Sequence, residues 1–419
     1  RKSMALIKPF RAVRPRAELA SRIAALPYDV YDREEARKEV EREPESFLQI
    51  DRAETMCGKE TDLYSEEVYR KAHDLLWEKI ENGTFVQDEK PCYYLYELVM
   101  EGRSQTGIVA CASIDDYENG IIKKHECTRA EKEQDRICHV DACDAQTGPI
   151  FLAYRKNEEL KKIIKEVKKE QPQFDFQTND GIIHRGWKVE KNDQIEKMER
   201  LFKNIKEIYI ADGHHRAASA VKVGMKRRKE HPDYTGEEEF NFFLSALFSE
   251  EELFIMDYNR VVKELNGYSK EEFLKKTEEK FTVIPSDKMV RPEKKGEIGM
   301  DLEGAWYLLK TKEKYEQTDP VEGLDVSYLQ RELLSPVLGI KDPKTDKRIC
   351  FVGGIRGLEE LERRVRTDCN VAFSMYPTTI QELFEVADAG RLMPPKSTWF
   401  EPKLRSGLFL HLIGEEKSR

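Results

Sequence analysis

The chain has 419 residues, of which 36% are charged and 39% are hydrophobic, and its formal net charge is −9. This acidic balance does not provide the global positive field of a DNA-coating protein, so we expect no nucleic-acid partner. The sequence contains no run of about 18 apolar residues and no apolar signal region, which predicts a cytoplasmic protein without a membrane span.

Apolar periodicity predicts helices and strands in mixed order through the first half of the chain. Val68, Ala72, Leu76 and Ile80, for example, recur at helical spacing, and Asn82 with Gly83 ends that helix. Similar patterns predict helices over 34–43, 65–81, 157–170 and 194–202, a strand over 5–13, hairpins over 92–114 and 176–189, and a turn and buried strand over 147–154. The first half therefore combines helices with antiparallel pairs.

The charged segment 226–239 contains Pro232 and Gly236 and is typical of a linker or exposed loop. Beyond it, we expect strands at 240–248, 305–310, 350–353, 372–375 and 409–412, and helices at 269–281, 326–334, 358–366 and 379–387. The whole pattern predicts an α+β fold with mixed sheets and two lobes, one over 4–232 and one over 240–419.

The segment from Ile208 to Ala220 passes from a buried-strand pattern through Gly213 into an alanine-rich helix pattern. His214, His215 and Arg216 should then lie at a helix N-terminus, where free N–H groups and the helix dipole favour anions such as phosphate. Asp212, just before the turn, is a candidate ligand for a divalent metal. The competing interpretation is that the two histidines cap the helix or make core hydrogen bonds.

Two further clusters point to phosphate chemistry. Arg129 and Arg136 are seven residues apart at the start of an expected helix, which puts them on one face, although ordinary ion pairs with Glu126 and Glu133 explain them equally well. Near the C-terminus, cationic and hydroxyl side chains are dense enough to bind an anion, with a lysine-rich surface loop as the alternative. The residues of this second cluster are Lys396, Ser397, Thr398, Lys403 and Arg405.

Two other patterns are weak. Cys127, Cys138, His139 and Cys143 do not have a common zinc spacing, so reduced thiols are expected. The glycine-rich turn at 353–357 is neither a dinucleotide fingerprint nor a P-loop.

Four blocks of the sequence together resemble a known family. The turn 212–216 resembles the signature of the ParB/sulfiredoxin superfamily, which includes free-serine kinases. Residues 394–409 resemble the C-terminal signature of a large bacterial family, long described as a domain of unknown function, some of whose members are pyrophosphate-dependent L-serine kinases. Residues 125–129 with 135–136, and residues 26–30, resemble the central and N-terminal signatures of that family.

The resemblance implies a ParB/sulfiredoxin-like core with helical insertions and a magnesium-dependent transfer of phosphate from pyrophosphate to free L-serine. In this scheme Gly213, His214, His215 and Arg216 bind pyrophosphate, and the clamps named above assist them. Asp212 contacts Mg²⁺. Asp29 is the expected base for the serine hydroxyl, with Glu126 as its rival, and both Glu126 and His125 are expected to contact substrate.

The resemblance leaves other functions open. An ATP- or ADP-dependent serine kinase or a phosphohydrolase is the nearest alternative, and a ParB-like, nucleotide-controlled DNA-binding protein is a more distant one. A ligand sensor without turnover is a further possibility. No oligomeric state follows from the residues.

Overall fold

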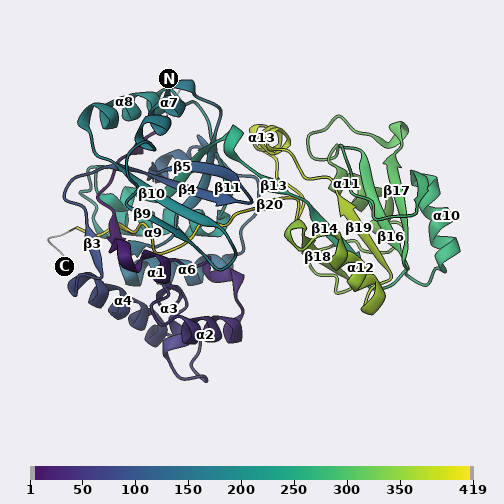
Figure 1. Ribbon diagram of the computed structural model, residues 1–419, viewed down its shortest axis with the longest axis horizontal. Helices are drawn as coiled ribbons and strands as arrows, with labels where there is room; N and C mark the ends of the chain where they lie inside the picture. The colour runs from purple at the N-terminus through teal and green to yellow at the C-terminus, as the bar shows by residue number, and fades with distance from the viewer. Residues whose placement is uncertain (1–4, 416–419) are drawn as a thin grey trace. The chain divides into compact units, whose positions relative to one another are not determined.

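The computed structural model describes residues 5–415 and divides into two compact units (Figure 1). The first unit comprises the chain up to Leu253 together with the segment from Pro402 onward, and the second comprises Phe254–Glu401. Both units combine helices with β-sheets, which confirms the predicted α+β class with two lobes. The outer ends of the two predicted lobes, residue 4 and residues 416–419, lie outside the described residues.

The boundary between the units, after Leu253, differs from the loop at 226–239 that the sequence indicated. β12 (Phe242–Ser249) lies beyond that loop, yet it pairs with β5 (Arg103–Ser113) and β8 (Ile150–Tyr154) in the middle of the first sheet. Because β12 is almost completely buried there, the first unit cannot end before it. The last segment of the chain also returns to the first unit, through β21 (His411–Leu412) on β7 (Ala145–Gln146).

The first unit is built on a nine-stranded mixed sheet with the order β6-β11-β8-β12-β5-β4-β10-β9, in which β1 also pairs with β5. The other strands of this sheet are β1 (Ile7–Lys8), β4 (Tyr93–Met100), β6 (Ile122–Lys123), β9 (Phe174–Gln177), β10 (Ile183–Val189) and β11 (Ile208–Asp212). The strands β2 (Val13–Pro15) and β3 (Phe85–Gln87) pair with each other in a separate two-stranded sheet. Strands β4, β8 and β12 are nearly continuous apolar runs, as expected for central strands covered on both faces.

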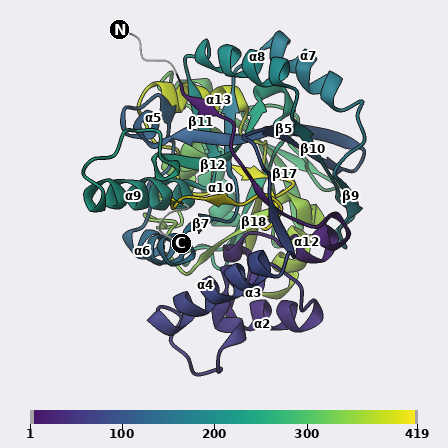
Figure 2. The same cartoon turned by 90° about the vertical axis from the view of Figure 1, so that its left-hand side faces the viewer.

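Helices cover both faces of this sheet (Figure 2). The helices of the first unit are α1 (Ala20–Ile23), α2 (Arg33–Arg42), α3 (Leu48–Asp51), α4 (Glu66–Glu81), α5 (Ile114–Glu118), α6 (Ala130–Cys143), α7 (Glu158–Val167), α8 (Asn192–Lys203) and α9 (His214–Glu230). In both views α7 and α8 lie on one side of the sheet and α6 and α9 on the other. Phe47, Leu76, Phe85 and Leu410 belong to a separate apolar core beneath α1–α4.

The second unit contains a six-stranded antiparallel sheet with the order β15-β17-β16-β19-β14-β18. The strands of this sheet are β14 (Tyr258–Val262), β15 (Phe281–Ser286), β16 (Glu297–Leu302), β17 (Ala305–Thr311), β18 (Ile349–Gly353) and β19 (Val371–Met375). The strands β13 (Ile255–Met256) and β20 (Trp399–Phe400) form a separate two-stranded sheet. The helices of this unit are α10 (Lys270–Lys280), α11 (Asp325–Leu329), α12 (Leu358–Thr367) and α13 (Ile380–Asp388). No helix within residues 5–415 is long and apolar enough to cross a membrane.

Gly407 anchors the returning C-terminal segment to the helical core of the first unit. Its φ of +91° is in the left-handed region, and a Cβ atom added there would lie 2.7 Å from Cβ of Phe47. Gly120, with a φ of +76°, has no atom within 4 Å of such a Cβ. The two glycines therefore share the backbone constraint and differ in steric contact.

We expect Gly407→Ala to lower the free energy of unfolding by about 2–4 kcal/mol, because it combines left-handed strain with overpacking against Phe47. Gly120→Ala, the matched control, should cost only about 1 kcal/mol. Urea denaturation of both variants measures the difference. Equal losses would show that the contact with Phe47 does not restrain the segment.

Candidate active site

The predicted strand–turn–helix over Ile208–Ala220 is present, and its strand β11 ends with an irregular register. The register of β11 against β8 shifts between Ile210 and Asp212, so the chain bulges at Ala211. Gly213 then adopts a φ of +90°, and α9 begins at His214 without a side-chain cap. The turn leaves the first N–H groups of α9 uncapped by side chains, an arrangement that suits an anion.

Asp212 is held on both sides of its carboxylate. Its Oδ1 accepts a hydrogen bond from the Gly213 N–H at 2.9 Å, and its Oδ2 lies 3.2 Å from Nζ of Lys403. Burial acts to raise the pKa of Asp212, but the charges of Lys403 and Arg216 outweigh it and leave the pKa below its usual value. Asp212 is therefore ionised at neutral pH and already neutralised by a lysine from the C-terminal segment.

His214 is a neutral imidazole with its proton on Nδ1. Its Nε2 accepts a hydrogen bond of 3.3 Å from the His125 N–H, and its ring packs edge-on against that of His125 at 4.4 Å. Burial, with the neighbouring His125, holds the pKa of His214 well below its usual value. Nδ1 lies 3.6 Å from a Glu126 oxygen and has no hydrogen-bond partner within residues 5–415. It is thus a donor that makes no hydrogen bond, with the Glu126 carboxylate beyond hydrogen-bonding distance.

His215 has the same tautomer for the same reason. Its Nε2 accepts a 3.1 Å hydrogen bond from the Arg129 N–H, which leaves Nδ1 to carry the proton of the neutral ring. Burial lowers the pKa of His215, the charge of Lys132 acts in the same direction, and the charge of Asp29 opposes them. The predicted central block and the predicted turn are therefore in direct contact, and Asp29 lies within electrostatic reach of His215.

Arg216 is half-buried between two glycines. A Cβ atom added to Gly148 would lie 3.2 Å from its NH1, and one added to Gly213 would lie 3.1 Å from its NH2. Its one hydrogen bond within the described chain goes to the Pro149 carbonyl at 3.2 Å, and no carboxylate there forms an ion pair with it. The guanidinium therefore keeps most of its donors for a ligand.

Arg129 and Arg136 do not form the matched pair that their spacing predicted. Arg129 is exposed just before α6, whereas Arg136 is 7% exposed, pairs with Asp135 at 2.8 Å and stacks 3.9 Å from the centre of the Tyr28 ring. The difference arises because α6 packs against α4 and α9 on the side that carries Arg136. Arg136 is thus committed to protein partners.

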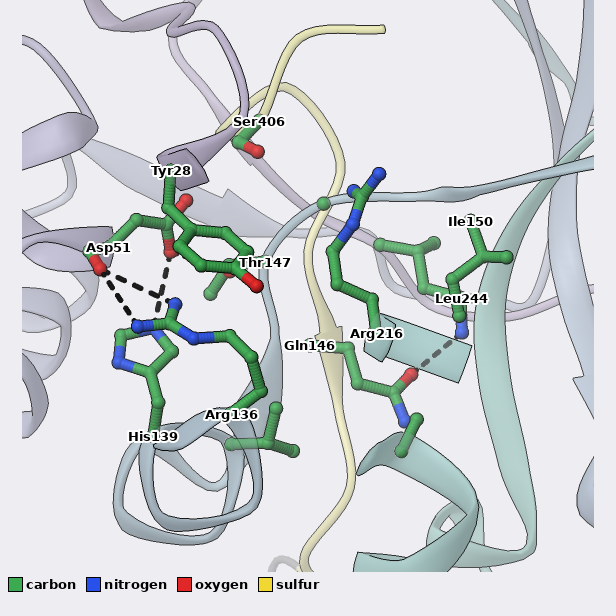
Figure 3. Close-up of a pocket in the computed structure, with 13 residues that line it drawn as sticks. Tyr28, Asp51, Arg136, His139, Gln146, Thr147, Ile150, Arg216, Leu244 and Ser406 are labelled. Carbon is green, nitrogen blue, oxygen red and sulfur yellow. Dashed lines mark hydrogen bonds and ion pairs between the residues drawn. The ribbon is translucent and has the colours of Figure 1, made fainter. Parts of the chain in front are cut away.

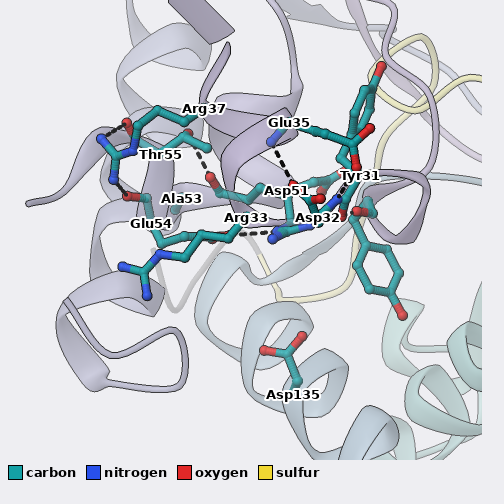
Figure 4. Close-up of polar contacts among 12 residues, drawn as sticks. Tyr31, Asp32, Arg33, Glu35, Arg37, Asp51, Ala53, Glu54, Thr55 and Asp135 are labelled. Atoms are coloured by element: carbon teal, nitrogen blue, oxygen red, sulfur yellow. Dashed lines mark hydrogen bonds and ion pairs between the residues drawn. The ribbon is translucent and has the colours of Figure 1, made fainter. Parts of the chain in front are cut away.

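Asp29 is exposed in the short turn Tyr28–Val30, which an arginine holds in place. NH1 of Arg52 donates to the carbonyls of Tyr28 and Tyr31 at 3.0 and 2.7 Å. Figure 4 shows the neighbouring supports, in which Asp32 and Glu35 form a capping box at α2 and Arg37 donates to the carbonyls after α3. The turn that presents Asp29 is therefore anchored by backbone contacts on both sides.

The predicted C-terminal cluster is divided between the two units. Lys403 and Arg405 lie in the first unit, where Arg405 is 3% exposed, pairs with Asp180 and donates to the Lys403 carbonyl. Lys396, Ser397 and Thr398 lie in the second unit. There the Ser397 hydroxyl donates to the Pro394 carbonyl at 2.6 Å and the Lys396 carbonyl accepts from Arg260. Their participation in the site stays a prediction.

Two cavities of the first unit share lining residues, and Figure 3 shows the one that includes Arg216 of α9. With the open solvent at their mouths included, the one that contains Arg216 has about 470 Å³ of empty space and the one that contains Asp29 about 750 Å³. We name them the Arg216 cavity and the Asp29 cavity. Tyr28, Asp51, Arg136 and His139 line both. Thr147, Gly148 and Ser406 line the Arg216 cavity alone.

Sequence reasoning did not identify Asp51 or Thr147, and it considered His139 only as an unlikely zinc ligand. The one local signal for Asp51 is its position directly after Phe47–Ile50, which is apolar except for Gln49, where a carboxylate is unexpected. A metal site made wholly of protein groups is not present, since no cluster of three or more His, Cys, Asp or Glu side chains within residues 5–415 could hold an ion.

Comparison with known proteins places the chain in a family. A search of curated proteins gave no match. Similar solved structures include a free serine kinase mutant in complex with AMP (14% identity, 70% of this chain and 87% of that chain, TM-score 0.35) and a conserved hypothetical protein from Pyrococcus furiosus (14%, 75% and 97%, TM-score 0.34). SbnI with a C-terminal truncation, from Staphylococcus aureus, has 12% identity over 73% and 87%, with a TM-score of 0.36. The sequence profile described as "Protein of unknown function (DUF1015)" matches residues 7–327, so the chain belongs to the DUF1015 family.

Proposed function

We propose that this protein is a kinase that transfers a phosphoryl group from pyrophosphate to the hydroxyl of free L-serine, giving O-phosphoserine and phosphate. The observation that carries the proposal is the set of unused donors at the start of α9. Arg216 has no carboxylate partner within residues 5–415, and Nδ1 of His214 makes no hydrogen bond there. Together with the uncapped N-terminus of α9, these two donor groups are suited to bind an anion.

The donor side follows from this charge arrangement. Pyrophosphate would take hydrogen bonds from the first N–H groups of α9, from Nδ1–H of His214 and His215, and from Arg216. Arg129 and Lys132 would add positive charge from the start of α6, because neither has an ion pair within the described chain. Such fixed donors stabilise the charge that spreads over the transferred group, which is most of what phosphoryl transfer requires.

Magnesium fits this site as an ion bound largely by substrate. Mg²⁺ commonly uses one or two carboxylates together with phosphate oxygens and water. Asp212 is the carboxylate that would hold it, directly or through water, and Lys403 would have to share or release Oδ2. When bound, the ion supplies charge neutralisation on the phosphate oxygens.

On the acceptor side, Asp29 is assigned as the base. Its carboxylate lies within electrostatic reach of His215, one of the proposed hydrogen-bond donors to phosphate, and the Arg52 contacts hold its turn in place. The serine oxygen would form a bond to phosphorus as the bridging P–O bond breaks. The hydroxyl proton would pass to Asp29 and the electron pair of the broken bond to the leaving phosphate.

The choice of substrates draws on the resemblance of residues 26–30, 125–136, 212–216 and 394–409 to pyrophosphate-dependent L-serine kinases. Residues of three of these blocks interact in the first unit, since the Arg129 N–H donates to His215 and the charge of Asp29 acts on His215, which supports a shared site. The fourth contributes Lys403, which pairs with Asp212. Arg136 and Arg405 already have carboxylate partners, so we assign them supporting roles in place of direct phosphate contacts.

Phosphorus NMR of the protein with Mg²⁺ and L-serine tests the proposal, with pyrophosphate, ADP and ATP offered separately. We expect O-phosphoserine with pyrophosphate and none when serine is omitted. Product formed only from a nucleotide would reassign the donor, and phosphate without phosphoserine would indicate a hydrolase. The absence of any phosphorus-containing product with all three donors would contradict the kinase assignment.

We expect Asp29→Asn to lower kcat by about 10²–10⁴-fold, because the amide cannot accept the serine proton. Glu126→Gln is the matched variant, since Glu126 is the other carboxylate next to the histidines, and its kcat should fall much less. Steady-state kinetics with both variants, with unfolding curves as the fold control, measure this. Near wild-type turnover in folded Asp29→Asn would exclude Asp29 as the base.

We expect Arg216→Ala to lower kcat/KM for pyrophosphate by about 10²–10³-fold, since it removes a donor to the transferring group. Arg216→Lys should restore only part of this, because an ammonium keeps the charge without the planar fork. Arg200→Ala, an exposed arginine on α8, is the control and should stay within about twofold of wild type. An unchanged Arg216→Ala enzyme would remove Arg216 from the donor site.

A further inference from the structure

Asp51 is a buried carboxylate that none of the steps above uses. It ends the short helix α3, is 5% exposed, and lines both the Arg216 cavity and the Asp29 cavity. A carboxylate is rarely buried without partners that compensate for lost hydration. Its hydrogen bonds therefore show whether it serves only the fold.

The hydrogen-bond donors to the carboxylate of Asp51 all reach the same one of its two oxygens, Oδ1. Oδ1 accepts hydrogen bonds from the Thr147 hydroxyl at 2.8 Å and from Nε2 of His139 at 3.2 Å. Arg136 donates through NH1 and NH2 to the main-chain oxygen of Asp51, both at 3.4 Å, and makes no hydrogen bond to its carboxylate. Within residues 5–415, Oδ2 has no hydrogen-bond donor at all.

The carboxylate carries its negative charge at neutral pH. Burial acts to raise the pKa of Asp51, but the hydrogen bond and charge of His139, together with the charge of Arg136, outweigh it and hold the pKa below its usual value. An ionised oxygen that lacks a donor in a cavity is costly unless a ligand or water supplies one. An ammonium group offers three donors and a compensating charge.

The neighbours of Asp51 fix where such a ligand would lie. Thr147 and His139 hold Oδ1, so the carboxylate cannot turn without losing both hydrogen bonds. The cavities that Asp51 lines contain Asp29 on one side and Arg216 on the other, which are the proposed base and a proposed pyrophosphate ligand. A small acceptor held at Asp51 would therefore occupy cavities that also reach the proposed base and the proposed pyrophosphate ligand.

We infer that Asp51 binds the α-ammonium group of the acceptor and so makes the site selective for an amino acid over a hydroxy acid of the same shape. The inference rests on the proposed function for the identity of the acceptor. It adds a residue that recognises the substrate and takes no proton in the transfer. Thr147 and His139 act through Asp51 as positioning residues.

The test compares L-serine with L-glycerate, in which a hydroxyl replaces the ammonium group. Asp51→Asn keeps the acceptor oxygen for Thr147 and His139 but removes the negative charge. We expect kcat/KM for L-serine to fall by about 10–100-fold, the effect of losing a hydrogen bond to a charged group. The KM for pyrophosphate and the rate with L-glycerate should change by less than about twofold, so the preference for serine collapses.

Asp116→Asn is the matched control, because Asp116 is a buried carboxylate on α5 that accepts a hydrogen bond from the Leu6 N–H and lines neither cavity. It should leave the serine-to-glycerate preference unchanged. A folded Asp51→Asn enzyme that keeps the wild-type preference would overturn the inference while leaving the kinase assignment intact.

Binding by wild-type protein provides a second measurement that needs neither turnover nor a folded variant. Isothermal titration with L-serine and with L-glycerate, each in the presence of Mg²⁺, should show serine bound at least tenfold more tightly. Equal affinities would overturn the role of Asp51 even if phosphoserine forms. Selective serine binding without phosphoserine from any donor would support Asp51 and reject the proposed reaction.

Discussion

The geometry of the site depends on how the chain leaves β11. The bulge at Ala211 and the left-handed Gly213 turn the chain so that α9 starts directly at His214. A residue with a Cβ at position 213 would be strained there and would crowd the Arg216 guanidinium. The same glycine therefore aligns the helix N-terminus and leaves room for Arg216, so the donor groups of the site follow from one backbone conformation.

The electrostatics of the site depend on two backbone N–H groups as much as on side chains. The backbone N–H groups of His125 and Arg129 donate hydrogen bonds to Nε2 of His214 and of His215, respectively. Burial keeps both rings neutral. Neutral rings with fixed tautomers donate from Nδ1 without adding positive charge to a region that already contains Arg216 and Lys132. The segment before α6 thus sets the hydrogen-bonding role of the first residues of α9.

The C-terminal segment completes the first unit from a distance in sequence. After the second unit, the chain returns at Pro402, and Lys403 reaches the carboxylate of Asp212. Ser406 lines the Arg216 cavity, and Gly407 packs on Phe47 beneath it. The lining of the cavity therefore includes Ser406, a residue that follows the whole second unit in the chain, which couples the formation of the site to the return of this segment.

Local sequence patterns were enough to predict the elements that carry the site. The apolar strand, the glycine and the alanine-rich helix at 208–220 lie in one continuous stretch, as do the helical stripe of α4 and the β4–β5 hairpin, so their short-range periodicity identified them. The α+β class followed from the order of such elements.

Only the tertiary structure decided which charges remain available to a ligand. The sequence does not distinguish the arginines at 129, 136, 216 and 405. Folding pairs Arg136 with Asp135 and Arg405 with Asp180, whereas Arg216 forms no ion pair with a carboxylate within the described chain. The cavity at Asp51 likewise joins α3, α6 and the turn at Thr147, which are far apart in the sequence. Pairing and burial depend on long-range packing, which no local pattern encodes.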